Sequence, residues 1–290
     1  MLPPFQNEPF TDFSTDQNAA QMREAISSVE SQFGREYPLI VGGKRYTTGD
    51  LLASPNPSDY EEVVGLVHKA TSDLADKALE EATAAFHEWK NVAPDIRARY
   101  LLKVASLLRK RKAEFTAWIT LEVGKSWAEA DGDVAEAIDF CEFYARDMIR
   151  FNQEQPLTPM PGEQNELYYL PLGVGVVIPP WNFPLAIMAG MTMASVVSGN
   201  TVILKPSSDS PVVAAKFVEL LEEAADDLVG VRRGTEPVEL GKDLGERLLR
   251  VGDGALGVVL ALLFKAALAL HEFFTIESRY GVERRFTKGT

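Results

Sequence analysis

Residues 171–207 constrain the fold of this chain more than any other segment, because they have the pattern of two buried strands joined by a helix. A β-branched run over 174–178 ends at two prolines, which is typical of a parallel strand buried on both faces. The apolar, alanine-rich run 185–197 predicts a tightly packed helix that stops at 198–200 (Ser-Gly-Asn). A second strand is expected over 201–204.

A strand, helix and strand in this order also predict where a ligand would bind. A unit of this length joins two parallel strands by a right-handed crossover, and ligands of such sheets collect beyond the carboxyl ends of the strands. In this sequence Trp181, Asn182 and Lys205 follow those ends. We therefore expect an α/β fold in which these residues form a nucleotide site.

The motifs at the strand ends are specific enough to indicate a family. PPWNFP followed by GNTVILKPS resembles the cofactor-side signature of the NAD(P)-dependent aldehyde dehydrogenase superfamily. NEPFTDF, YPLIVGGKRY and SPNPSDYEEVVG resemble its 1-pyrroline-5-carboxylate (L-glutamate γ-semialdehyde) dehydrogenase branch, and the resemblance covers about residues 5–225. It implies a Rossmann-type α/β cofactor domain with preceding helices. The family lacks the GxGxxG fingerprint, so its absence here is no evidence against NAD.

The resemblance implies roles for single residues on the cofactor side. Asn182 matches the amide that stabilises the oxyanion when a thiolate adds to an aldehyde, a donor typically worth about 3 kcal/mol, whereas a turn-capping asparagine is the structural alternative. Lys205 and Ser208 match contacts to the adenosine ribose, although Lys205 could also be an ordinary solvated strand-end lysine. The implied NAD site comprises Ile178, Pro179, Pro180, Trp181, Lys205 and Ser208.

Two further residues match the substrate side of the family. Glu136, in AEAIDF, matches a helix position near the substrate entrance, and a plain surface glutamate fits it equally well. Phe183 follows the oxyanion amide and could touch the substrate or the core. The complete family enzyme would oxidise the small-molecule aldehyde L-glutamate γ-semialdehyde to L-glutamate with NAD, in proline catabolism.

The nucleophile of the family reaction is a cysteine. Its thiolate attacks the carbonyl, the resulting hemithioacetal passes hydride to the nicotinamide, and water hydrolyses the thioester. Cys141 is the single cysteine, and its helical apolar surroundings predict a core residue. Glu239 lies in VELGK, where Lys242 replaces a glycine of the family's general-base motif, so that role is not transferred. We expect the chain alone to be inactive; the alternative function is a non-catalytic NAD-binding or subunit-pairing module.

The resemblance divides the chain into two parts. Residues 1–225 are expected to form a partial cofactor-binding domain with amino-terminal helices and an oligomerisation hairpin, and 226–290 a tail without family motifs. A frameshifted or truncated reading frame would produce such a junction, and so would a genuine replacement domain. The apolar run 255–270 is shorter than the ~20 residues of a membrane span and contains Lys265, which favours a buried helix.

Composition excludes several classes of partner. The net charge of −13 argues against nucleic acid and anionic membranes. One cysteine is consistent with a reducing compartment, and the amino end lacks a secretory signal, so a cytoplasmic location is expected. The three histidines are isolated from any metal-like spacing, and no metal site is expected.

Local signals predict the remaining elements. A helix over 16–33 begins at Ser14 or Thr15 and stops at Gly34, and the glycine pair 42–43 joins two short strands within 39–46. Another strand is expected over 63–70, helices over 72–89, 94–120 and 127–151, and a solvated face at the basic run 109–112. The resemblance implies a hairpin at 166–171 that would make the contacts of a homo-oligomer.

Overall fold

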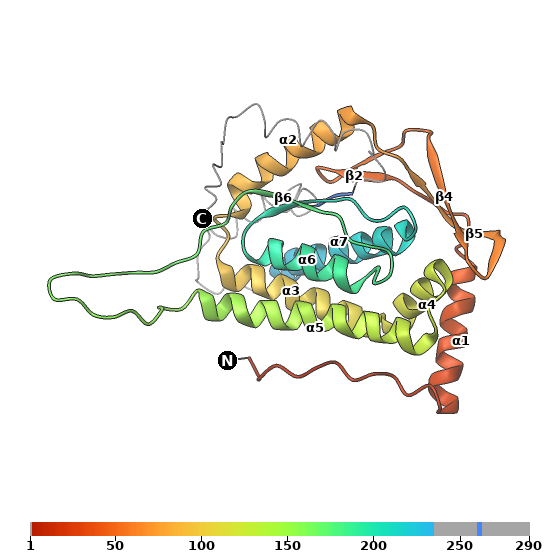
Figure 1. Ribbon diagram of the computed structural model, residues 1–290, viewed down its shortest axis with the longest axis horizontal. Coiled ribbons are helices and arrows are strands. Elements are labelled where there is room, and N and C mark those ends of the chain that lie inside the picture. Colours follow the sequence, from red (N-terminus) through yellow and green to blue (C-terminus); the bar gives the residue numbers. More distant parts are fainter. Residues whose placement is uncertain (1, 235–259, 263–290) are drawn as a thin grey trace, which may run out of the picture.

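The computed structural model describes residues 2–234 and 260–262 (Figure 1). The helices are α1 (Asp16–Glu30), α2 (Ser72–Trp89), α3 (Pro94–Lys110), α4 (Lys112–Val123), α5 (Trp127–Phe151), α6 (Ala186–Val197) and α7 (Pro211–Gly234). The strands are β1 (Glu36–Tyr37), β2 (Leu39–Val41), β3 (Lys44–Tyr46), β4 (Leu51–Asn56), β5 (Asp59–His68), β6 (Val174–Val177), β7 (Thr201–Leu204) and β8 (Leu260–Leu262).

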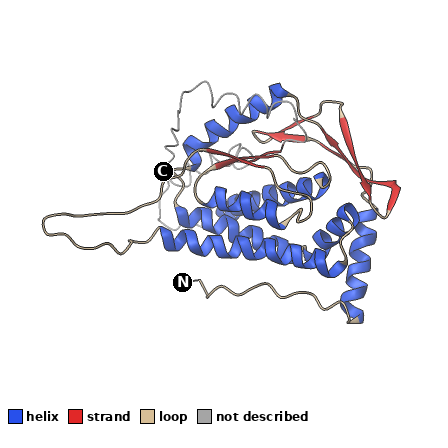
Figure 2. Cartoon of the chain, in the orientation of Figure 1, coloured by secondary structure: helices blue, strands red, loops and turns tan. Residues whose placement is uncertain are grey.

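These elements form stacked layers (Figures 1 and 2). The larger sheet has the strand order β3-β2-β8-β7-β6, and a smaller sheet has the order β1-β5-β4. Helix α2 contacts β2, β6 and β7, helix α6 also packs on β6 and β7, and α5 packs against α3 and α6. One continuous apolar core therefore runs from the larger sheet through α6 to the layer of α3 and α5.

The expected strand, helix and strand are confirmed. Strands β6 and β7 pair in parallel with Val177 opposite Leu204, and α6 connects them. β7 is fully buried, as expected. The expectation that both faces of the first strand are buried is wrong, because β6 is the last strand of its sheet in the part that the structure describes and Val176 is 44% exposed.

The expected helix over 255–270 is wrong where the structure can test it. Residues Leu260–Leu262 form strand β8, which pairs in parallel with β7 and in antiparallel fashion with β2. A three-residue apolar segment can complete a sheet as readily as it can start a helix, and periodicity does not separate the two. The other residues of that run lie outside the described residues, as does Glu239.

Several local signals are confirmed. Thr15 caps α1, its Oγ1 accepting a hydrogen bond from the Asn18 N–H. Gly42 and Gly43 adopt positive φ angles of 58° and 71° in the turn between β2 and β3, a conformation that favours glycine. Helices α2 and α5 have the expected bounds, and α5 begins with a capping box formed by Ser126 and Glu129.

The helix expected over 94–120 is interrupted at Arg111, which separates α3 from α4 with φ −105° and ψ 21°. The expected solvated basic face is confirmed for Arg109 and Lys110, which are exposed, and wrong for Arg111 and Lys112, which are partly buried. Arg109 pairs with Glu8 and Glu142, Arg111 with Glu114 and Glu223, and Lys112 with Asp131. Except for Glu114, which is three residues after Arg111, these acidic partners lie 19 or more residues away in the sequence.

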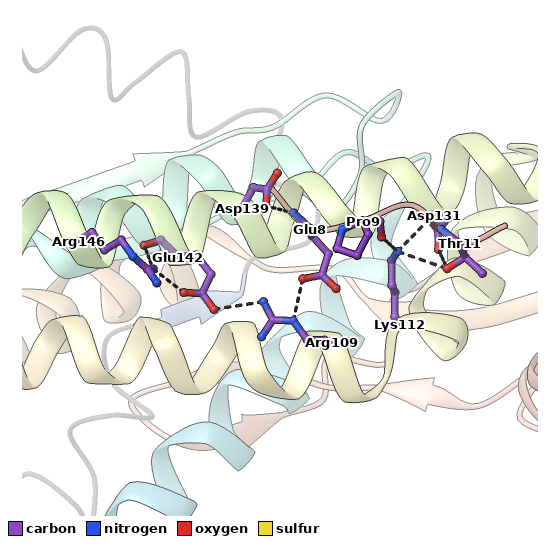
Figure 3. A network of polar contacts seen from close by, with 9 residues as sticks. All are labelled: Glu8, Pro9, Thr11, Arg109, Lys112, Asp131, Asp139, Glu142 and Arg146. Atoms are coloured by element: carbon purple, nitrogen blue, oxygen red, sulfur yellow. Dashed lines mark hydrogen bonds and ion pairs between the residues drawn. The ribbon is translucent and has the colours of Figure 1, made fainter. Parts of the chain in front are cut away.

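Residues 2–13, which we call the amino-terminal strap, run along α5 (Figure 3). Asp139 of α5 accepts a hydrogen bond from the Glu8 N–H at 2.7 Å, and Asp131 accepts two from Thr11, at 2.8 Å from its N–H and 2.6 Å from its hydroxyl. Lys112 donates to Asp131 at 2.9 Å and to the Pro9 carbonyl at 2.8 Å. The strap is therefore fastened to both α4 and α5.

The hairpin expected at 166–171 has no strand pairing in this structure. No strand is assigned among residues 152–173; they form a long excursion away from the body of the molecule (Figure 1), with a turn at Met160–Glu163 in which Gly162 has φ 82°. The segment 166–171 lies on the returning arm. Its apolar residues lack a partner strand among the described residues and are exposed: Leu167, Tyr168, Tyr169 and Leu170.

Candidate functional site

The two segments expected to form the site lie at one edge of the larger sheet. Segment 178–185 follows β6, and Lys205 follows β7 directly. The two strands are parallel neighbours, and the Lys205 N–H donates to the Val177 carbonyl at 2.9 Å. The carboxyl ends that the sequence predicts to meet therefore do meet.

Segment 178–185 presents a mixed apolar and amide surface. Ile178 and Trp181 are 46% and 52% exposed, and Asn182 is also exposed, whereas Pro179 is buried. The side chain of Asn182 makes no hydrogen bond with any residue that the structure describes. It does not cap its own turn, so the structural alternative for Asn182 finds no support in this geometry.

Lys205 and Ser208 lie where β7 leads into α7. Lys205 is half-buried, and its Nζ donates to the Pro206 carbonyl at 3.2 Å. Ser208 is partly exposed in the turn that precedes α7. The ammonium group of Lys205 is thus held close to the end of β7, whose parallel neighbour β6 leads into segment 178–185.

An interaction that the sequence did not reveal fixes the end of this segment. Asp133 of α5 accepts a hydrogen bond from the Ala186 N–H at 2.7 Å, at the first turn of α6. Its other oxygen pairs with Lys125 Nζ at 2.7 Å, and this ammonium lies 3.9 Å from the centre of the Phe183 ring. The signal that could have found Asp133 is a carboxylate on the apolar face of an amphipathic helix, which needs a partner.

Glu136 lies one turn after Asp133 on α5 and is exposed. Partial burial and the neighbouring Asp133 carboxylate raise the pKa of Glu136, while Lys125 opposes that shift. Burial likewise raises the pKa of Asp133, and Lys125 and the first backbone N–H groups of α6 act against it. The structure therefore places Glu136 in the field of the pair that contacts Phe183 and α6.

Cys141 is a core residue, as expected. Its side chain is fully buried on α5, and burial raises the pKa of its thiol far above the ordinary value. A buried thiol with a raised pKa supplies no thiolate near neutral pH. No group of three or more His, Cys, Asp or Glu residues suited to a metal ion occurs among the described residues.

The comparisons with known proteins show the family of the chain. The model of the aldehyde dehydrogenase family matches residues 46–249, and the chain belongs to this family. The match extends past residue 225, where the sequence motifs end. The chain is 54% identical over 224 residues to 1-pyrroline-5-carboxylate dehydrogenase 1 of Halalkalibacterium halodurans, covering 77% of this chain and 44% of that protein. For the Geobacillus thermodenitrificans 1-pyrroline-5-carboxylate dehydrogenase the identity is 52%, with the same coverage.

Solved structures give the same result. A Thermus 1-pyrroline-5-carboxylate dehydrogenase with bound NAD superimposes with a TM-score of 0.79 at 42% identity, over 94% of this chain and 47% of that one. The Mycobacterium tuberculosis Δ-pyrroline-5-carboxylate dehydrogenase bound with NAD gives 0.75 at 26% identity, over 93% and 46%. The chain thus spans less than half the length of these relatives. Among the described helices, none combines the length and apolarity needed to cross a membrane.

Proposed function

We propose that this chain carries the NAD-binding portion of a 1-pyrroline-5-carboxylate dehydrogenase. The observation that supports it is the position of Asn182 and Lys205, which follow adjacent parallel strands at one sheet edge. The family match and the relatives' names support the same reaction: oxidation of L-glutamate γ-semialdehyde to L-glutamate, a step of proline catabolism.

The residues at this edge fit a dinucleotide. Ile178 and Trp181 offer exposed apolar surface for flat rings, and Lys205 and Ser208 offer donors for ribose hydroxyls. The backbone of Pro179 and Pro180 would contribute to the same site. When bound, NAD supplies the acceptor for the hydride of the aldehyde, while the protein's part is to hold and orient it.

On the substrate side, Asn182 directs a carboxamide toward the developing oxyanion. A donor that has no competing partner in the described chain is available for this purpose. Glu136 and Phe183 would contact the aldehyde; Glu136 lies one turn after Asp133, whose partner Lys125 contacts the Phe183 ring.

Because Cys141 is buried with a raised pKa, we expect no aldehyde oxidation by the 290-residue chain itself. An aldehyde-dependent NADH assay on purified chain tests this, and turnover without any longer polypeptide present would contradict it.

Isothermal titration calorimetry with millimolar NAD tests the cofactor proposal. The chain should bind NAD, and Lys205→Met should weaken binding at least fivefold. Lys110→Met is the matched control, since Lys110 is an exposed lysine at the end of α3. No heat with the folded wild-type chain, or equal loss in both variants, would count against the site.

A subunit-pairing role rests on a different observation. The apolar side chains at 167–170 are between 50% and 73% exposed on an excursion that leaves the body of the molecule (Figure 1). An apolar patch of this kind marks an interaction surface, here between copies of the chain in a homo-oligomer. Light scattering tests it: replacing Tyr168 and Leu170 by serine should lower the oligomer mass, and an unchanged mass would reject this surface.

The division into residues 1–225 and a tail of 226–290 remains our proposal. It is supported by the 224 aligned residues of the curated relatives, although the family model continues to residue 249. Reading the gene in three frames beyond residue 225 tests whether the tail is frameshifted.

A cytoplasmic location is proposed on the single cysteine and the acidic charge balance, and fractionation of expressing cells tests it.

A further inference from the structure

The pair formed by Lys125 and Asp133 contacts the end of segment 178–185, through the Phe183 ring and the Ala186 N–H. Both side chains are largely buried, with 15% and 0% exposure, and their charges stand 2.7 Å apart. Burying an ion pair costs desolvation free energy that its own attraction barely offsets. A pair that contributes little stability by itself suggests that its contacts with the neighbouring segment matter.

Asp133 acts on the backbone at the start of α6. The residue before this helix, Leu185, makes no side-chain cap, and the Ala186 N–H is bonded instead by the Asp133 carboxylate, 53 residues earlier in the chain. A carboxylate at a helix amino terminus also interacts favourably with the helix dipole. The end of segment 178–185 is therefore fixed from α5.

Lys125 acts on a side chain of the same segment. Its ammonium lies 3.9 Å from the centre of the Phe183 ring, the geometry of a strong cation–π contact, while the Asp133 carboxylate holds it from the other direction. Gly124 ends α4 in the left-handed conformation with φ 73° and Ser126 caps α5, so the backbone on both sides of Lys125 is fixed. One face of the Phe183 ring is thereby occupied.

We propose that Lys125 and Asp133 are positioning residues of the cofactor and aldehyde site. Asp133 fixes the backbone of residues 183–186, and Lys125 fixes the orientation of the Phe183 ring. Asn182, the residue before Phe183, is held in place as a consequence. A substrate can then meet only the opposite face or the edge of Phe183. The expected effect on NAD binding rests on the proposed function, whereas the expected effect on the backbone of 183–186 does not.

The chain offers a matched control. Lys112 and Asp131 form a second largely buried pair, with 13% and 3% exposure and 2.9 Å between the charges, half a turn earlier on α5. Asp131 also accepts a backbone N–H, that of Thr11, but it fastens the strap instead of segment 178–185. Making the same substitution in each pair therefore separates a general loss of stability from a local effect on segment 178–185.

The experiment measures amide hydrogen exchange and NAD affinity on the full 290-residue chain. Asp133→Asn should accelerate exchange in the peptide containing Leu185 and Ala186 at least tenfold and raise the Kd for NAD at least threefold, whereas Asp131→Asn should accelerate exchange only in the strap. Lys125→Met should raise the Kd similarly, and Lys125→Arg should restore it because the cation is kept.

The outcomes separate the two proposals. If the wild-type chain binds no NAD, the cofactor site fails, while the exchange measurement still decides the positioning role. If Asp133→Asn does not fold, Lys125→Met decides, since it leaves the carboxylate on Ala186. Unchanged exchange at 183–186 in Asp133→Asn, an equal change there in Asp131→Asn, or an unchanged Kd for NAD in Lys125→Met would overturn the inference.

Discussion

Glu122, near the end of α4, accepts a hydrogen bond from the backbone N–H of Val213 at 2.7 Å and so caps the first turn of α7, 91 residues later. The same carboxylate accepts from the Val212 N–H and from the Ser54 hydroxyl, each at 2.7 Å. Helix α7 follows the Lys205–Ser208 turn, so this buried carboxylate joins α4, β4 and the candidate site region.

Burial raises the pKa of Glu122 to about 7, because desolvation of the charge outweighs its three hydrogen bonds. In the unfolded chain the pKa is near the ordinary 4.5, so between pH 4.5 and 7 the unfolded state loses a proton that the folded state retains. The free energy of unfolding should therefore fall as the pH rises from 4.5 through 7, by a few kcal/mol from this group.

Glu122→Gln removes that titration. Urea unfolding at pH 5 and pH 8 should show a smaller pH dependence for Glu122→Gln than for the wild type, while the exposed Glu61→Gln should keep the wild-type dependence. An identical pH dependence in all three proteins would show that Glu122 does not titrate in this range.

The amino-terminal strap should depend on Asp131 (Figure 3). Asp131→Ala removes the acceptor of the Thr11 N–H and the carboxylate that pairs with Lys112. Lys112 is only 13% exposed, so its charge would stay largely buried without a partner carboxylate at this position. Losing one partner of a buried pair typically costs about 3–5 kcal/mol, so urea unfolding should show a loss of this order and proteolysis should cut the strap sooner.

Asp147→Ala is the control for the strap. Asp147 pairs with Arg150 on the surface of α5, where the two side chains are 30% and 62% exposed, and such pairs contribute about 0–1 kcal/mol. Equal losses of stability in the two variants would refute a specific role for Asp131.

The sequence predicted the elements whose ends carry their own signals. Thr15 and the glycine pair at 42–43 act within three or four residues, so they can be recognised without knowing the fold. The motifs at 181–182 and 205 likewise predicted two strand ends, and these ends are neighbours in the structure. The break at Arg111 and the Lys125–Asp133 pair depend on partners from 8 to more than 100 residues away, which local patterns do not specify.

An exposed edge explains the error at β6. Burial on both of its faces was expected from a pattern that describes a strand inside a completed sheet, whereas the hairpin at 166–171 was implied by the family resemblance. In this structure Val176 is 44% exposed and Tyr168 is 68% exposed, because no described strand covers β6 or pairs with the returning arm. Sequence periodicity shows which side chains of a segment can be buried, but it does not identify the element that covers them.

Cys141 should be inert in the folded chain. Its full burial and raised pKa predict that an aromatic disulfide reagent reacts with the thiol at least a hundredfold more slowly in native buffer than in 6 M guanidinium. Cys141→Ala, which cannot react in either state, provides the baseline. Rapid modification of the native protein would mean that the thiol reaches solvent, and it would reopen Cys141 as a nucleophile.

The contact between α5 and α6 should tolerate no side chain at Gly190. A Cβ added there would lie 2.9 Å from the Phe140 ring, which is stacked on Tyr144 with ring centres 5.5 Å apart and therefore cannot move freely. Alanine in a helix interior is favoured over glycine by about 1 kcal/mol, whereas overpacking a core costs about 1–3 kcal/mol. The cost of overpacking should exceed the gain in helix propensity, so Gly190→Ala should lower the free energy of unfolding by about 1 kcal/mol.

Gly132 provides the opposite case on α5. A Cβ there would meet the exposed Phe10 ring at 3.9 Å, an ordinary van der Waals contact, so only the helix propensity changes. Gly132→Ala should therefore stabilise the chain by about 0.5–1 kcal/mol in urea unfolding. Because α6 carries segment 178–185 at its amino end, Gly190→Ala should also accelerate amide exchange at Ala186, and Gly132→Ala should not. Stabilisation by both variants would mean that α5 and α6 pack less closely at Gly190 than the 2.9 Å between an added Cβ and the Phe140 ring implies.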